Sequence, residues 1–186
     1  YYPKVAIDLF IALIFLGGVV MDYNAKFRES LNKYLFLEIE KKKLLEYFPL
    51  NDMVLKEDLI LLPINSQYIV NGSKAQENLS MVYFIEGMFY VLGADPSFKY
   101  NTEYKTILSS NSVNSDYIKS KIAEYFKKEE FEKTFILLRG LLEINSDKEV
   151  FRQAINVGEL IRSRDNEFSN IQLALLENYK EYYQND

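Results

Sequence analysis

The chain of 186 residues contains no histidine, no cysteine and no tryptophan. Without histidine, the commonest general base is missing, and so are Ser-His and Cys-His nucleophile pairs and nearly every kind of zinc site. Without cysteine, there is no disulfide framework, no thiolate nucleophile and no Cys-ligated metal, and the redox compartment cannot be read. The sequence therefore predicts a protein that is not an enzyme, with no catalytic residue, no metal ligand and no cofactor.

Positive charge is also in short supply, because the formal net charge is -5 and the pI is near 5.0. A protein whose main ligand is nucleic acid needs a concentrated positive field, so the composition argues against this class of partner. One basic run, Lys41–Lys43, is flanked by Glu38, Glu40 and Glu46, and this mixture is typical of a solvated helix face. With 48% hydrophobic and 26% charged residues, the chain has the composition of a globular protein.

The longest apolar run, Leu9–Met21, is shorter than the roughly 20 residues that a membrane span requires, and it contains Gly17 and Gly18. We expect a helix over about 4–20 that packs inside the protein or against a second copy, which allows a homo-oligomer but no stable membrane span. The run lacks a convincing basic start or small-residue cleavage site of a signal peptide. Cytoplasmic location is the resulting expectation.

What the chain does have is apolar residues at helical spacing along most of its length, which predicts an all-α fold. Residues 1–72 are expected to form an N-terminal helical region, and residues 73–186 a set of helical repeats. Proline and Asn71-Gly72-Ser73 mark the breaks, and 64–71 is interpreted as a connector. The expected helices cover about 4–20, 24–47, 53–62, 74–92, 95–108, 115–127, 130–145, 147–164 and 166–184.

The segment 117–145 is the most informative, because it reads as two antiparallel helices joined at Lys127–Glu130. Such a pair cannot bury its apolar face alone and needs neighbours. The residues that define the pattern are Ile118, Ile122, Tyr125, Phe131, Glu132, Thr134, Leu138 and Leu141. In these positions the segment resembles the tetratricopeptide repeat, with a late aromatic in the first helix, an aromatic-acidic start of the second and a small residue where the helices touch.

The resemblance implies stacked antiparallel helix pairs in a right-handed solenoid, with the region before residue 73 as a helical cap. It implies a scaffold or adaptor that binds a protein or peptide in a concave groove lined by the first helix of each pair. The residues that would face this groove are Lys119, Arg152, Gln153, Asn156 and Glu159. Arg152 and Asn156 resemble the pair that grips a ligand carboxylate in peptide-binding members, whereas Ala123 replaces the corresponding Asn one repeat earlier.

Other interpretations remain open at this stage. The chain could be a subunit of a homo-oligomeric or membrane-associated assembly, the ligand-sensing half of a regulator, or, least favoured, a carboxylate-dependent enzyme. Two carboxylates in opposed environments within a deep pocket would favour the enzyme. Glu86, which lies in the apolar stretch Met81–Leu92, is expected either to pair with a neighbouring helix or to be the exposed residue of that stretch.

Overall fold

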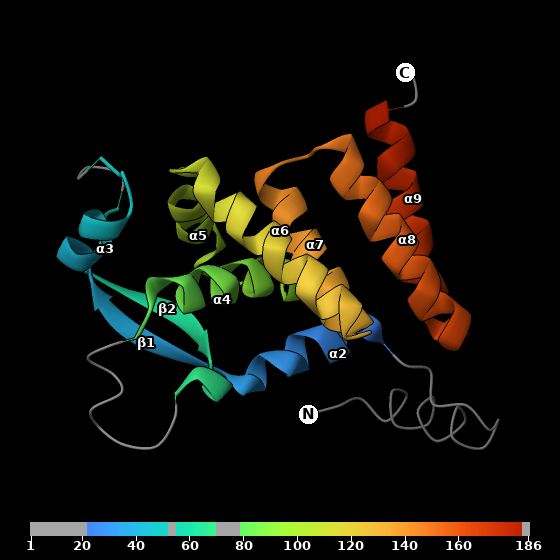
Figure 1. The fold of residues 1–186 in the computed structure, drawn as a ribbon, viewed down its shortest axis with the longest axis horizontal. Coiled ribbons are helices and arrows are strands. Elements are labelled where there is room, and N and C mark those ends of the chain that lie inside the picture. Colours follow the sequence, from blue (N-terminus) through green and yellow to red (C-terminus); the bar gives the residue numbers. More distant parts are fainter. Residues whose placement is uncertain (1–21, 52–54, 70–78, 184–186) are drawn as a thin grey trace, which may run out of the picture.

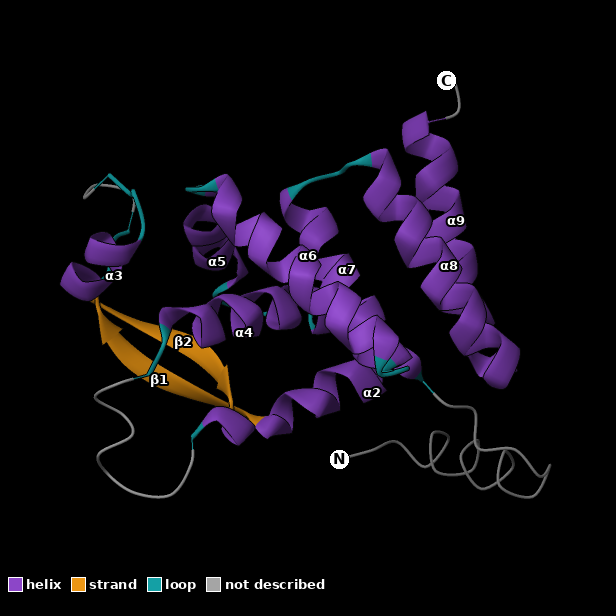
Figure 2. Cartoon of the chain, in the orientation of Figure 1, coloured by secondary structure: helices purple, strands orange, loops and turns teal. Residues whose placement is uncertain are grey.

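The computed structural model describes residues 22–51, 55–69 and 79–183, and most of them are helical (Figures 1 and 2). The expectation of a mainly helical chain is therefore confirmed. The expected N-terminal helix at 4–20 lies outside the described residues. No helix in the described ranges is long and apolar enough to cross a membrane.

The first part of the chain differs most from the expectation. A single helix was expected over 24–47, but the structure has α2 (Tyr23–Glu29), a 3-10 turn (Ser30–Lys33), strand β1 (Tyr34–Glu40) and α3 (Lys41–Tyr47). The expected helix at 53–62 is also wrong, because Leu59–Asn65 forms strand β2. A 3-10 turn follows at Ser66–Tyr68, within the segment that was interpreted as a connector.

Strands β1 and β2 form a two-stranded antiparallel sheet in which Tyr34 pairs with Asn65 and Glu40 with Leu59. The sheet survives as only two strands because one of its faces is covered, since an isolated hairpin is at best marginally stable in water. Strand β2 packs on helix α4 (Met81–Ala94), and Ile60, Leu62 and Ile64 are buried. The side chain of Tyr104 also donates a hydrogen bond to the carbonyl oxygen of Leu61 at 2.6 Å.

Helix α4 is the centre of the molecule, and every residue from Phe84 to Ala94 is buried. It packs against β2 on one side and against helix α7 (Phe131–Ile144) on another. The crossing with α7 is backbone against backbone, because a Cβ atom on Gly93 would lie 1.8 Å from the carbonyl oxygen of Ile136. Gly93 was expected to end its helix, but its lack of a side chain serves this close approach inside the last turn.

The remaining helices are α5 (Asn101–Ser109), α6 (Ser112–Lys127), α8 (Lys148–Arg164) and α9 (Ser169–Tyr183). Helix α5 begins later than the expected Asp95, because residues 95–100 form turns. Helix α6 begins earlier than expected, because the Asn111 side chain accepts a hydrogen bond from the Val113 amide and caps it. Helices α6 to α9 follow one another as expected, and each packs on the next. Phe131, Leu138 and Phe151 are buried.

The turn between α6 and α7 falls at the expected residues, 127–130. Glu129 adopts the left-handed conformation with φ 57°, and the Glu130 amide donates to the Tyr125 carbonyl at 3.0 Å. The Glu129 amide donates to the Phe126 carbonyl, so that the final carbonyls of α6 are satisfied in a Schellman arrangement.

Helix α2 lies beside the ends of α6 and α7 where these two helices are joined, as Figure 1 shows. The Tyr23 hydroxyl donates a hydrogen bond to Asp165 Oδ2 at 2.5 Å, and Lys26 Nζ lies 2.7 Å from Glu132 Oε1. Phe27 packs against Phe135 and Phe168, with ring centroids 6.1 and 6.5 Å away. The start of the described chain is thereby fixed against α7 and the α8–α9 turn.

Candidate functional site

A groove of about 420 Å³ runs between α6 and α8 and has α7 as its floor. Figure 1 shows α6 and α8 running in the same diagonal direction, while α8 packs mainly on α7 and α9. The floor and lower walls are apolar, and their residues are almost wholly buried. They comprise Ile122, Leu138, Val150 and Val157 together with the methyl-bearing Thr134. The hydroxyl of Thr134 is satisfied by the Glu130 carbonyl at 2.7 Å, so it leaves the floor without an unpaired polar group.

Three of the five expected site residues come together at this groove. Lys119 lies on the α6 wall, and Gln153 and Asn156 lie on the α8 wall, where all three are exposed. Arg152 and Glu159 are exposed on α8 but do not line the groove. Successive helical residues are about 100° apart, so Arg152 points well away from Gln153, which lies at the middle of the groove face.

Glu159 is engaged elsewhere on its own helix. Arg162 lies three residues later, and its guanidinium donates hydrogen bonds to both carboxylate oxygens of Glu159. The bond to Oε2 is 2.9 Å long. This bonding holds the pKa of Glu159 below its usual value. The Glu159 carboxylate is therefore already paired with a cation and is not directed at the groove.

The rim of the groove has opposite charges on its two walls. Lys119 stands on α6, while Asp147 and Glu149 stand at the start of α8. Asp147 accepts a hydrogen bond from the Glu149 amide at 2.9 Å and so caps α8. Lys119 and Glu149 form none of the ion pairs among the described residues. The groove is therefore apolar below and charged above, with one cation on the α6 wall and two carboxylates on the α8 wall.

Phe126 is a groove-lining residue that the sequence did not single out. Its side chain is 44% exposed although it is large and apolar. Ile118, Ile122 and Tyr125 define the buried stripe of α6, and Phe126 lies at the edge of that stripe. An aromatic next to, rather than within, an apolar stripe was the available signal, because exposed aromatics are frequent anchors for partners.

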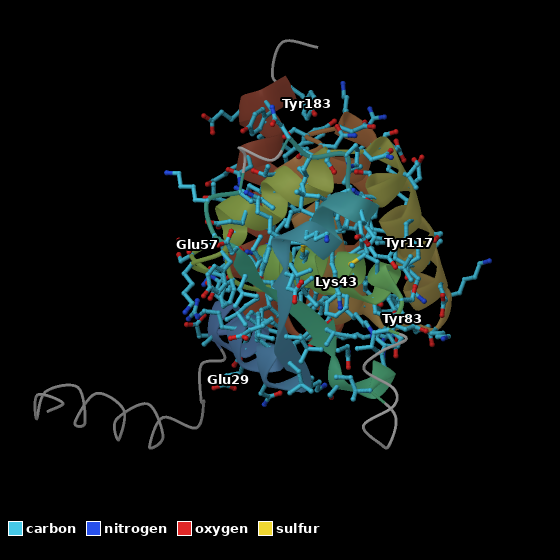
Figure 3. All side chains as sticks on the ribbon, turned by 90° about the vertical axis from the view of Figure 1, so that its left-hand side faces the viewer. Glu29, Lys43, Glu57, Tyr83, Tyr117 and Tyr183 are labelled. Atoms are coloured by element: carbon cyan, nitrogen blue, oxygen red, sulfur yellow. The ribbon has the colours of Figure 1, made fainter. Side chains whose placement is uncertain are left out.

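Glu86 is the one buried carboxylate among the described residues, and two tyrosines satisfy it. Tyr68 donates to Oε2 at 2.6 Å, and Tyr125 donates to Oε1. The two hydroxyl oxygens are 3.3 Å apart, and the ring of Tyr68 stacks on Tyr83 with centroids 4.0 Å apart. Figure 3 shows Tyr83 and Tyr117 on the same side of the molecule.

Burial, and then the hydrogen bond to Glu86, raise the pKa values of Tyr68 and Tyr125. Burial also raises the pKa of Tyr117 to about 12. The hydroxyls of Tyr68 and Tyr125 therefore stay protonated and donate to the Glu86 carboxylate at neutral pH. The cluster ties the 3-10 turn at 66–68 and helices α4 and α6 together.

A hollow of about 980 Å³ lies between α2 and the start of α7. It contains several carboxylates, but each of the best placed has a partner. Glu132 pairs with Lys26 at 2.7 Å, and Asp165 accepts a hydrogen bond from Tyr23 that lowers its pKa. Glu132 and Asp165 are therefore both engaged by side chains of α2.

Across residues 22–51, 55–69 and 79–183, no three acidic side chains gather in a way that could hold a metal ion. Comparison of the chain with family models, with curated proteins and with solved structures found no match.

Proposed function

We propose that the protein is a non-enzymatic binding module that holds a peptide segment of another protein in the α6–α8 groove. The observation that carries the proposal is the groove itself, with an apolar floor and with Lys119, Gln153 and Asn156 gathered on its rim. Helix-lined grooves of this kind take side chains of a partner as anchors, and polar rim groups fix its orientation.

The chemistry of the rim specifies the partner. An apolar side chain of the peptide occupies the floor beside Phe126, and an acidic side chain lies against Lys119. A basic group lies toward Asp147 and Glu149 on the other wall. The carboxamides of Gln153 and Asn156 donate to and accept from the peptide backbone, since each carries both donors and acceptors.

Part of the support is the arrangement of the helices as two consecutive pairs, α6–α7 and α8–α9. Helices α6 and α8 begin at Ser112 and Lys148, 36 residues apart, close to the 34-residue period of the tetratricopeptide repeat. We propose that the two pairs stack as in that family. Small-angle scattering from the chain extended by further designed pairs would show a superhelical rod if they do, and a globule if they do not.

The absence of cysteine allows a direct test of the groove. Ala123→Cys places a single thiol on the exposed α6 wall, where a bulky maleimide adduct blocks access. Random peptides displayed on phage are selected against the unmodified protein. We expect enriched peptides that combine a large apolar residue with an acidic residue, and we expect the adduct to abolish their binding.

The matched control is Ser120→Cys, which carries the same adduct on an exposed α6 residue outside the groove lining. This variant should retain peptide binding. If the selected peptides bind equally well to both adducts, the α6–α8 groove is not the binding site and the proposal fails.

A further inference from the structure

The side chain of Arg139 on α7 lacks the partner that a partly buried charge needs. Its Nη1 atom is buried and has no hydrogen-bond partner, and Arg139 forms none of the ion pairs among the described residues. The guanidinium carbon lies 5.8 Å from the ring centroids of both Phe27 and Phe135. These rings offer cation–π attraction, but neither offers an acceptor for the N–H groups.

An unpaired guanidinium in this position is unfavourable, because it stays charged in a protein and loses its hydration. Burial lowers the pKa of Arg139, and the carboxylate of Glu143 one turn later offsets this only in part. Glu143 is committed to another cation, since its Oε2 lies 2.8 Å from Lys105 Nζ. The three side chains therefore sum to one uncompensated positive charge.

Arg139 lines a pocket of about 540 Å³ between α7 and α9, beside the start of α2. It lies about 100° around α7 from Leu138, which faces the groove, so the two sites open on different sides of the helix. The pocket has an apolar part made of Phe135, Leu142, Phe151, Ile171 and Leu175. Its polar edge includes three exposed carboxamides, Asn24, Asn170 and Asn178, and the carboxylate of Glu143, which is paired with Lys105.

We propose that this pocket binds a small carboxylate with an apolar body, whose carboxylate supplies the counter-charge and acceptor that Arg139 lacks. The planar guanidinium suits a carboxylate because it can donate two parallel hydrogen bonds. The apolar body packs on the phenylalanine and leucine side chains, and the volume lies within the range of small-molecule sites. A monoanion balances the single excess charge, whereas a phosphate dianion would leave negative charge beside Glu143.

The test uses hexanoate as the probe and the full chain at neutral pH, with hexanol and hexylamine as isosteric controls. Binding is followed by two-dimensional NMR of the side-chain amides. We expect saturable shifts of Asn170 and Asn178 with hexanoate at millimolar affinity, which is ordinary for so small a ligand. Equal binding of hexanol would overturn the proposal, because it would show that the charge does not matter.

Arg139→Gln should weaken hexanoate binding about tenfold or more, because it removes a charged hydrogen-bond donor. Arg28→Gln is the control, since Arg28 is an exposed arginine of α2 outside the pocket. If Arg139→Gln does not fold, Asn178→Asp serves instead, because it adds a repelling carboxylate at an exposed edge. Unchanged affinity in the folded Arg139→Gln or Asn178→Asp variant would also overturn the proposal.

The source of the carboxylate is resolved by two further probes. Acetyl-leucyl-leucine as the free acid and as the amide distinguish a peptide C-terminus from a small organic acid. Tighter binding of the dipeptide acid than of hexanoate, with no binding of the amide, would support a peptide terminus. Binding of hexanoate alone would support a small acid, and tighter binding of inorganic phosphate than of hexanoate would contradict the assignment.

Discussion

The two sides of α7 are built in opposite ways. Toward α4, glycines let the backbones touch, and a Cβ on Gly140 would lie 2.0 Å from the carbonyl oxygen of Phe89. Toward α6 and α8, larger side chains such as Leu138 hold the neighbouring helices apart and leave the 420 Å³ groove. The comparison shows how one helix can anchor the core and also form the floor of an open groove. The close glycine contacts fix α7 against α4, so substitution of the rim residues on the other side leaves this packing intact.

Substitution of a glycine where α7 touches α4 should have the largest effect on stability. Gly140→Ala places a methyl group against the backbone of α4, where no flexible side chain can yield. We expect the free energy of unfolding to fall by about 3 kcal/mol or more, since the helices must separate to admit it. Urea denaturation followed by circular dichroism measures the change. Ser120→Ala on the exposed face of α6 is the control and should stay within about 0.5 kcal/mol.

Alkaline pH should also lower the stability of the packed core around α4, where tyrosines are buried. Burial is the main cause that raises the pKa values of Tyr34 and Tyr104 well above their usual value. In the unfolded chain these groups ionise near pH 10, whereas in the folded protein they remain protonated. Their contribution is fully present below about pH 10, and it is lost as the pH rises above this value.

Each such tyrosine can reduce the free energy of unfolding by up to about 1.4 kcal/mol per pH unit above pH 10. Urea denaturation at several pH values, with phenolate absorbance as a second signal, measures the slope. Tyr104→Phe should make the slope of the free energy of unfolding against pH shallower by the contribution of about one proton, because it removes one of the ionising hydroxyls. A stability that stays flat above pH 10 would show that these hydroxyls ionise in the folded state.

The Glu86 cluster joins α4 to α6, and its disruption should have a smaller effect on stability. Tyr125→Phe removes a hydroxyl that donates to a buried carboxylate and leaves Tyr68 as its remaining donor. We expect a loss of about 1–3 kcal/mol in the free energy of unfolding. Tyr117→Phe is the matched control, because the Tyr117 hydroxyl forms none of the hydrogen bonds found among the described residues. Equal effects of the two substitutions would mean that the bond to Glu86 contributes little.

The sequence predicted α6 to α9 well because their signals are local. Apolar residues at helical spacing and the turn at 127–130 lie within one or two turns of each other, and tertiary packing agrees with them. Strands β1 and β2 failed because Leu35 pairs with Ile64, and no local pattern contains that partner. Apolar residues such as Leu35, Phe36 and Ile39 fit a helical stripe as well as a strand.

The candidate site was found in part for a related reason. Helical spacing placed Lys119, Gln153 and Asn156 on one surface, but it did not decide which residue of α8 lies at the middle of the groove. That choice depends on the rotation of α8 against α7, which buried residues such as Val150 and Val157 set. The surroundings of Glu86 and Arg139 were likewise out of reach, since Tyr68 and Phe27 come from distant segments.

The smallest effect on stability is expected on the open side. Gln153→Ala removes an exposed rim side chain at the middle of the groove and should change the free energy of unfolding by less than about 0.5 kcal/mol. The same substitution should weaken binding of the peptides selected on the unmodified protein by about 1 kcal/mol, the typical value of a neutral hydrogen bond. Arg152→Ala, one residue earlier but outside the groove lining, should weaken binding less. Fluorescence anisotropy of a labelled peptide and parallel urea denaturation give both quantities. If Arg152→Ala had the larger effect on binding, the peptide would lie across the outer face of α8, and the open side of α7 would not be the site that the partner reads.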